Sequence, residues 1–103
     1  MKKREKVDHD DYWRCVQAAV ADLRSGRFAE ADALLRQAIA LDYSRPEVYN
    51  ALGIMMELQG NRWQAQNYYR AALSLDPGYA PSRNNLDRTV GLWKPGQHVS
   101  KEA

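Results

Sequence analysis

The sequence matches itself at an offset of 34 residues. The positions that are identical between the two copies include Gly26/Gly60, Ala31/Ala65, Ala38/Ala72, Leu41/Leu75 and Asp42/Asp76. Repeats of about this length are typical of stacked helical hairpins, in which each unit buries its apolar face against its neighbour. Proteins built in this way usually hold other molecules instead of catalysing reactions. The offset therefore predicts an all-α protein that functions by binding.

The size and charge of the chain exclude several other classes. A chain of 103 residues is the size of one domain. No apolar run approaches the roughly 20 residues that cross a bilayer, and the charged N-terminus does not resemble a secretory signal, so no membrane insertion is expected. The net charge of +2 is too small to indicate nucleic acid as a partner. The single cysteine, Cys15, fits a reducing, cytoplasmic location, and the preference for arginine suggests a bacterial source.

Apolar residues recur at helical spacing along five segments that turn residues separate. The expected helices are residues 12–24, 28–41, 46–59, 62–75 and 80–93. Gly26 and Gly60 are expected to end the first and third helices, because glycine tolerates a left-handed turn. Residues 1–11 are expected to form a disordered arm, with Asp10 or Asp11 capping the first helix, and residues 94–103 a flexible tail. No segment has the pattern of a strand.

Residues 46–77 carry an ordered series of residue types: an aromatic, Leu-Gly, a large residue, a glycine, an alanine, an aromatic, a second alanine and a proline. These positions hold Tyr49, Leu52, Gly53, Met56, Gly60, Ala65, Tyr69, Ala72 and Pro77. The series closely resembles the tetratricopeptide repeat. The resemblance implies that the small Gly53 and Ala65 let the two helices of a hairpin approach closely. It also implies that Tyr49 and Tyr69 fill the space between hairpins.

The resemblance extends over residues 12–93, as two repeats (12–45 and 46–79) and a capping helix (80–93). The first repeat departs from the family in its first helix, where Cys15, Ala18-Ala19 and Asp22 replace an aromatic, Leu-Gly and a large residue, and Tyr43 replaces the closing proline. The polar capping helix is typical of the solvated end of such a stack. The family implies a right-handed superhelical solenoid of about five helices.

The resemblance also implies a ligand surface on the concave face, which the first helix of each pair mainly lines. The predicted partner-binding residues are Trp13, Val16, Val20, Arg24, Glu47, Asn50, Ile54, Glu57, Asn84 and Arg88. An apolar groove with a polar rim suits an amphipathic helix or an extended hydrophobic peptide. Two alternatives remain open: the apolar residues pack inside the chain, or they pack against another copy.

Some members of this family bind the C-terminal carboxylate of chaperones with a clamp of lysine, asparagine and arginine. The corresponding positions here hold Val16, Val20, Ala51, Pro81 and Asn85. The clamp is absent, so the acidic tails of chaperones are not the expected ligand.

Three further residues have a functional and a structural interpretation. Exposed tryptophans are enriched at interaction hot spots, but Trp63 and Trp93 are predicted to close the ends of the small core. Cys15 is predicted to be a buried small hydrophobic residue and not a reactive thiol, because only Arg14 supplies a nearby positive charge.

The residue arrangements that usually support catalysis are missing from the predicted helices. There is no glycine-rich phosphate loop and no histidine between residues 12 and 93, so no enzyme, cofactor or metal site is expected. Two repeats are too few to read RNA base by base. The sequence predicts a non-catalytic protein–protein interaction module of the adaptor, assembly-factor or co-chaperone type, which binds a peptide or helix on its concave face. The alternative is a self-assembling structural protein that uses the same groove.

Overall fold

Five α-helices make up the described part of the chain. The computed structural model describes the backbone of residues 3–91 and the side chains of residues 11–91. The helices are α1 (Lys3–Arg24), α2 (Phe28–Leu41), α3 (Glu47–Leu58), α4 (Arg62–Leu75) and α5 (Ala80–Thr89). No strand occurs within these residues, which confirms the all-α prediction. The predictions for Trp93 and for residues 94–103 fall outside the described residues.

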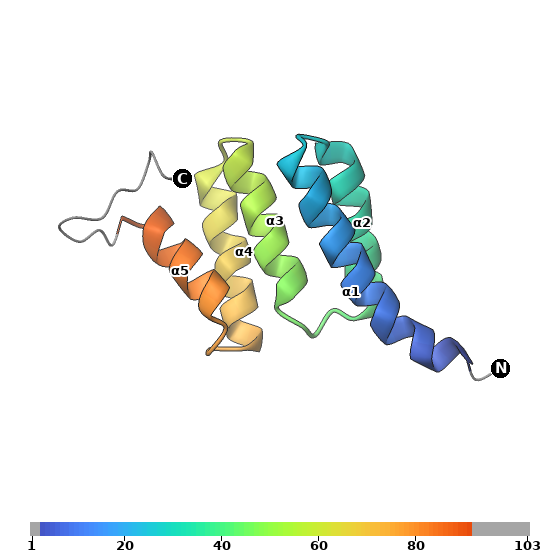
Figure 1. The fold of residues 1–103 in the computed structure, drawn as a ribbon. Coiled ribbons are helices and arrows are strands. Elements are labelled where there is room, and N and C mark those ends of the chain that lie inside the picture. Colours follow the sequence, from blue (N-terminus) through green and yellow to red (C-terminus); the bar gives the residue numbers. More distant parts are fainter. Residues whose placement is uncertain (1–2, 92–103) are drawn as a thin grey trace.

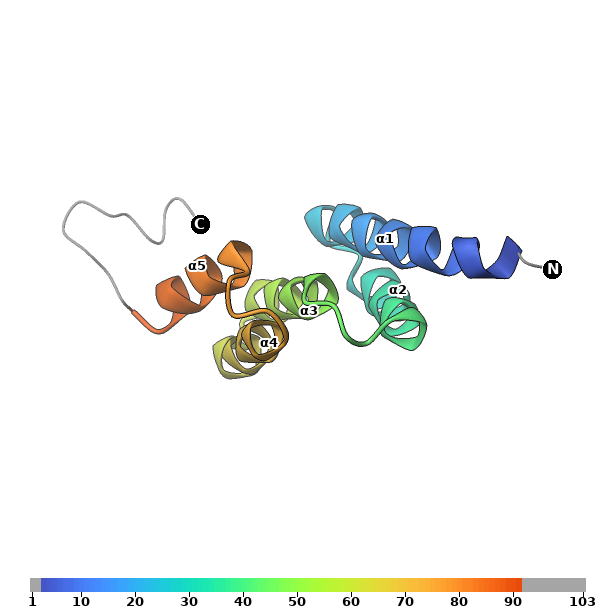
Figure 2. The same ribbon diagram turned by 90° about the horizontal axis from the view of Figure 1, so that it is seen from below.

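The helices pack as two hairpins followed by α5. Contacts are densest within the α1–α2 pair and the α3–α4 pair, α3 also meets both helices of the first hairpin, and α5 packs mainly on α4. Figure 1 shows the two pairs side by side, with α5 at the far end of the row. Seen from below, α1, α3 and α5 lie along one side of the row, and α2 and α4 lie along the other (Figure 2). The hairpins expected from the sequence repeat are therefore present.

The 34-residue offset is preserved in the backbone. The helices α2 and α4 begin and end 34 residues apart. Gly26 and Gly60 adopt φ of +76° and +83° at the turn inside each hairpin, a left-handed conformation that favours glycine. At the other end of each hairpin, the N–H groups of Asp42 and Asp76 donate to the carbonyl four residues earlier, at 2.9 and 3.0 Å. The same local signals therefore produce the same turns in both copies.

One core joins the two hairpins. It consists of Tyr12, Cys15, Val16, Ala19, Leu23, Ala31, Leu35, Ala38, Val48, Ala51, Leu52 and Met55. Its members come from α1, α2 and α3, so the face of α3 that meets the first hairpin is part of that core. Cys15 is 7% exposed, as predicted for a small buried hydrophobic residue. Burial raises the pKa of its thiol, and the negative charge of Asp11 adds to this effect.

The two ends of the helical part differ from the prediction. The first helix begins at Lys3 and not at residue 12, so residues 3–11 of the expected disordered arm are helical, and Asp10 and Asp11 lie inside the helix. No glycine or proline interrupts the chain before Arg24, and a helix that packing has nucleated extends at low cost. The helix α5 ends at Thr89 and not at residue 93, because Gly91 takes φ of +82° just beyond it.

None of the helices within residues 3–91 combines the length and the apolar character that a membrane-spanning segment needs.

Candidate functional site

A hollow lies between α3 and α5. Its volume is about 320 Å³, and its lining residues are Ile54, Glu57, Leu58 and Arg88. Ile54 and Glu57 are three residues apart, and Leu58 follows, so one turn of α3 supplies three of the four lining side chains. Leu58 is 54% exposed, although it is a large apolar residue. The hollow therefore joins exposed apolar surface to a pair of opposite charges.

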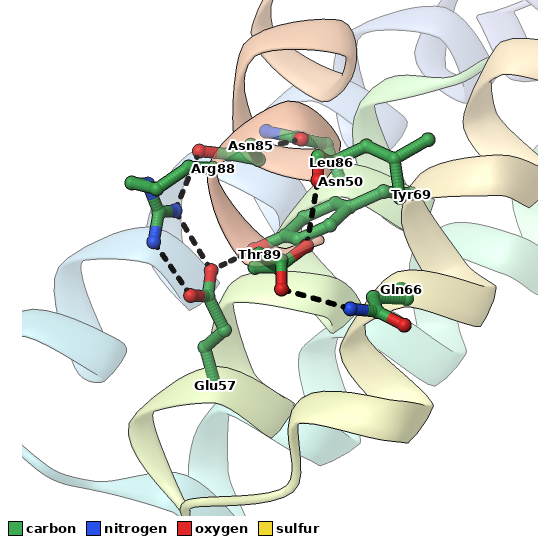
Figure 3. A network of polar contacts seen from close by, with 8 residues as sticks. All are labelled: Asn50, Glu57, Gln66, Tyr69, Asn85, Leu86, Arg88 and Thr89. Atoms are coloured by element: carbon green, nitrogen blue, oxygen red, sulfur yellow. Dashed lines mark hydrogen bonds and ion pairs between the residues drawn. The ribbon is translucent and has the colours of Figure 1, made fainter. Parts of the chain in front are cut away.

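Glu57 is held by side chains from two other helices. Arg88 donates from Nη1 to Oε2 at 2.7 Å and from Nη2 to Oε1 at 2.9 Å, and the Tyr69 hydroxyl donates to Oε1. Arg88 also donates from Nη2 to Oδ1 of Asn85 at 3.0 Å. Figure 3 shows the carboxylate of Glu57 facing the guanidinium of Arg88, with the hydroxyl of Tyr69 reaching the same carboxylate. A two-pronged arginine–carboxylate pair fixes geometry as well as charge, so α3, α4 and α5 are joined at one point.

The electrostatics of the pair favour its charged form. Burial alone would raise the pKa of Glu57, but the hydrogen bonds from Arg88 and Tyr69, and the charges of Arg88 and Arg62, outweigh burial and hold this pKa below its usual value. The hydrogen bond to Glu57 in turn raises the pKa of Arg88. Burial raises the pKa of the Tyr69 hydroxyl, which therefore remains a neutral donor. The ion pair is thus complete at neutral pH.

A second group of hydrogen bonds fixes α5 along its length. Oδ1 of Asn50 accepts from Oγ of Ser82 at 2.7 Å and from Nδ2 of Asn85 at 3.1 Å. Nε2 of Gln66 donates to the carbonyl of Thr89 at 3.0 Å, as Figure 3 shows. Ser82 is fully buried, and a buried hydroxyl is costly unless it is hydrogen-bonded. The position of α5 on α3 and α4 is therefore specified by polar side chains.

The structure brings together four of the ten predicted partner-binding residues. Asn50, Ile54 and Glu57 share one face of α3, and Arg88 of α5 lies against that face. The three polar members differ from the prediction, because they bond within the chain instead of forming a free rim. Asn84 is exposed on α5. Ile54 and the unpredicted Leu58 supply the apolar surface of the hollow.

The predicted residues of α1 do not form one exposed patch. Val16 is 4% exposed and belongs to the core. It is therefore unavailable to a partner, because α3 stacks against α1 and closes over this part of the helix. Val20 is half-buried and packs against the same core. Trp13 is 42% exposed, and Arg24 is exposed at the end of the helix.

Glu47 acts between the hairpins instead of facing a partner. Its Oε1 accepts a hydrogen bond from the Tyr12 hydroxyl at 3.2 Å and lies 3.5 Å from Nε of Arg45. The Tyr12 hydroxyl also accepts from the backbone N–H of Val48 at 3.1 Å, and the Arg45 guanidinium lies 4.5 Å from the centre of the Tyr12 ring. These contacts connect α1 to the first turn of α3.

Tyr12, whose side chain is fully buried, is not among the residues predicted from the sequence. The signal that could have identified it is its spacing, since Tyr12, Cys15, Val16, Ala19 and Leu23 form a continuous helical stripe. Trp63 was assigned to the end of the core, and this was wrong. It is 70% exposed on the first turn of α4, where no helix of residues 3–91 covers it.

Among the residues whose side chains are described, no group of three or more His, Cys, Asp or Glu residues could hold a metal ion. No family model matches the sequence.

The pair of Glu57 and Arg88 predicts a pH dependence of stability. Because the folded-state pKa of Glu57 is lowered, its contribution is complete above the unfolded-state value of about 4.3 and is lost as the pH falls through the folded-state pKa. Glu57→Gln is expected to lower the free energy of unfolding at pH 7 by about 1.5–3 kcal/mol, as for hydrogen bonds to charged groups. In urea titrations, this difference should shrink between pH 5 and about pH 3.

The control for this prediction is Asp32→Asn, which removes an exposed ion pair with Arg36. Exposed pairs contribute about 0.5 kcal/mol or less, so this variant should remain close to the wild type at pH 7. A Glu57→Gln difference that stays constant down to pH 3 would contradict the prediction.

Proposed function

We propose that this chain is a non-catalytic protein–protein interaction module of the tetratricopeptide type. In this proposal, the two hairpins and α5 form a short right-handed superhelical stack. A peptide or helix of a partner binds in the hollow lined by Ile54, Glu57, Leu58 and Arg88. The support for the fold assignment is the 34-residue period, which is found in the residue pattern and again in the helix bounds.

The observation that carries the proposal is the exposed apolar surface of the α3–α5 hollow. Leu58 is 54% exposed and Ile54 is half-buried, and both face a hollow of about 320 Å³. Covering apolar surface stabilises a complex by about 25 cal/mol per Å². The volume lies near the lower end of ligand sites, about 300 Å³, so we expect the hollow to take one large apolar side chain of a partner.

The ion pair beside the hollow is expected to orient a bound partner more than to attract it by charge. Glu57 and Arg88 neutralise each other, so a partner meets a nearly neutral surface at this point. Three N–H groups of Arg88 donate to Glu57 and Asn85. A guanidinium has five N–H donors, so we expect Arg88 to donate to a carbonyl oxygen of a partner backbone as well. An anchor side chain in the hollow, with its backbone bound to Arg88, would fix the register of the peptide.

The proposed role is that of an adaptor, assembly factor or co-chaperone in the cytoplasm. The five positions of the family's carboxylate clamp support recognition by apolar contact, because none of them holds a cation. Three of them are already used within the chain, since Val16 and Ala51 are buried and Asn85 donates to Asn50. We therefore expect internal apolar segments to bind, and not a C-terminal carboxylate.

A displayed library of random peptides, selected on the full chain, tests the proposal. We expect the selected peptides to share a large apolar residue. Ile54→Arg and Leu58→Arg are each expected to weaken the best peptide by about 30-fold, the effect of losing an anchor contact of about 2 kcal/mol. The measurement is fluorescence anisotropy of the labelled peptide.

The matched control is Leu75→Arg, which changes an apolar residue that is 43% exposed on α4, outside the hollow. This variant should bind as the wild type does. The proposal fails if no peptide is enriched, or if the selected peptides bind both hollow variants with unchanged affinity while circular dichroism shows both variants to be folded.

A further inference from the structure

The 34-residue repeat relates two junctions, at each of which a helix packs on the hairpin that precedes it. At the first junction α3 packs on the first hairpin, and at the second junction α5 packs on the second hairpin. The offset carries the core residues of α3 onto residues of α5: Val48 onto Ser82, Ala51 onto Asn85, Leu52 onto Leu86 and Met55 onto Thr89. The two docked helices therefore present equivalent positions, but three of the four apolar side chains of α3 are polar in α5.

The surface of the hairpin changes in the same way. The offset carries Val16 and Leu23 of α1, which both belong to the core, onto Asn50 and Glu57 of α3. Both of these α3 residues accept hydrogen bonds from side chains of α5 (Figure 3). The second junction thus has hydrogen bonds at the positions where the first junction has apolar contacts.

The two junctions therefore differ in how readily they open. Removing α3 from the first hairpin would expose apolar side chains to water, which is unfavourable. Within Ala80–Thr89 only Ser82 and Thr89 are buried, and water can replace the partners of polar groups at a small net cost. Water also reaches the ion pair, since the side chains of Arg88 and Glu57 are 32% and 22% exposed. The second junction is the weaker one.

The helix α5 depends on this junction for its structure. It has ten residues, fewer than the about 12–15 that an isolated helix needs in water. No side chain caps its first turn. Residues of low helix propensity make up half of it, namely Ser82, Asn84, Asn85, Asp87 and Thr89. Once it leaves α3 and α4, the helix is expected to unfold, so docking and helix formation are one step.

The link that precedes α5 permits this movement. Residues 76–78 are exposed, and the N–H of Gly78 donates to Oδ1 of Asp76 at 3.1 Å, a bond that lies within the link. The link of the first junction is held differently, because the guanidinium of Arg45 lies 4.5 Å from the centre of the Tyr12 ring in the first hairpin.

We propose that α5 is a latch, which undocks from α3 and α4 and unfolds as one unit while both hairpins remain folded. Openings of this kind lie between the fraying of chain ends and global unfolding. The α3–α5 hollow exists only while the latch is closed, because Arg88 lines it from α5 and holds Glu57 in place.

The latch goes beyond the proposed function and does not depend on it. Where a peptide does occupy the α3–α5 hollow, it binds the closed state alone and shifts the latch towards closure. Its apparent affinity falls with the fraction of closed molecules. A change that loosens α5 would therefore weaken partner binding without altering α3.

Native-state hydrogen exchange of the full chain, measured by NMR in low concentrations of urea, tests the latch. The amides of residues 84–89 should share one opening constant, larger by about 100-fold than that of the slowest amides of α1 and α3, as for a sub-global opening. Its urea dependence should be smaller than that of global unfolding, because less surface is exposed.

Arg88→Ala should raise the opening constant of all these amides by about 10-fold or more, the effect of losing a hydrogen bond to a charged group. The matched control is Arg83→Ala, which removes an exposed arginine from the same helix. This control should stay within about 3-fold of the wild type, as for a surface substitution.

The reverse change rebuilds the second junction with the residues of the first. Asn50→Val, Ser82→Val and Asn85→Ala, combined in one chain, should lower the opening constant by about 10-fold or more through added apolar burial. If this chain does not fold, the pair of arginine variants decides alone.

The latch is overturned if the amides of α5 exchange only through global unfolding, or if their protection declines steadily towards Thr89, as in fraying. It is overturned equally if Arg88→Ala changes these amides no more than Arg83→Ala does, or if the folded triple variant opens as readily as the wild type. These measurements contain no peptide, so their failure is distinct from a failure of the proposed function.

Discussion

Replacing Gly53 with alanine is expected to destabilise the second hairpin by about 1–3 kcal/mol, the usual cost of overpacking a core. A Cβ atom at this position would lie 2.6 Å from Cδ1 and 2.8 Å from Cζ of Tyr69, and closer still to Cε1. The ring cannot easily move aside, because it is fully buried and its hydroxyl is bonded to Glu57. Helix propensity alone would predict the opposite sign, a gain of about 1 kcal/mol.

The first hairpin indicates which second substitution should compensate for Gly53→Ala. The residues equivalent to Gly53 and Tyr69 are Ala19 and Leu35, and both are fully buried. One hairpin thus pairs a glycine with a large ring, and the other pairs an alanine with a smaller leucine. In the Gly53→Ala background, Tyr69→Leu is therefore expected to cost less than it costs alone, and the double variant should be more stable than the additive sum.

Urea unfolding of the wild type, the two single variants and the double variant measures this coupling. A coupling of about 1 kcal/mol or more, in the compensating direction, is expected for residues in direct contact. Additive free energies, or a Gly53→Ala variant as stable as the wild type, would show that the close approach of the ring does not limit this position.

The local parts of this fold could be predicted from the sequence. The bounds of α2 and α4 were predicted to the residue, because glycine turns, capping aspartates and apolar spacing act within a few residues of each other. The end of α1 was predicted equally well. Its start was not, because nothing in residues 3–11 stops a helix once packing has nucleated it.

The placement of side chains relative to distant helices could not be predicted from these local signals. Tyr12 and Trp13 are adjacent apolar residues on one helix, and either can begin a helical stripe. The choice between them depends on where α3 stacks, and the structure buries Tyr12 while leaving Trp13 42% exposed. Local patterns thus located the helix but not its rotation about its own axis.

For the candidate site, too, the sequence predicted which residues lie near one another but not the contacts that they make. The sequence grouped Asn50, Glu57 and Arg88 on one surface, and the structure brings them together. The sequence did not predict that Asn50 and Glu57 of α3 bond to side chains of α5, because such partners are far apart in the chain. Glu57 and Arg88, for example, are 31 residues apart. Contacts at that separation depend on how α5 packs against α3. Ser82 and Asn85 fix this packing through their hydrogen bonds to Asn50.

Replacing Tyr12 with alanine is expected to have the largest effect on the junction between the hairpins. Its side chain is fully buried between α1 and the start of α3, and removing a large buried aromatic costs about 3–5 kcal/mol. Domains of this kind are stable by only about 5–15 kcal/mol. We therefore expect Tyr12→Ala to lose most of its cooperative unfolding transition in urea.

The hydroxyl of Tyr12 has a separate contribution that Tyr12→Phe isolates. Burial raises the pKa of Tyr12, so the neutral hydroxyl donates to Glu47 while it accepts from the N–H of Val48. Phenylalanine fills the space but leaves this N–H without its acceptor, at a cost of about 1–3 kcal/mol. Amide hydrogen exchange should then be faster at Val48 than in the wild type.

The control for both variants is Tyr43→Ala, because the Tyr43 side chain is 73% exposed in the link between the hairpins. Its stability should remain within about 0.5 kcal/mol of the wild type. If Tyr12→Phe were as stable as the wild type and Val48 remained protected, the hydroxyl would not be needed at the start of α3. If Tyr12→Ala were no less stable than Tyr43→Ala, the two hairpins would hold together without this residue, through the apolar contacts of α1 and α2 with α3 alone.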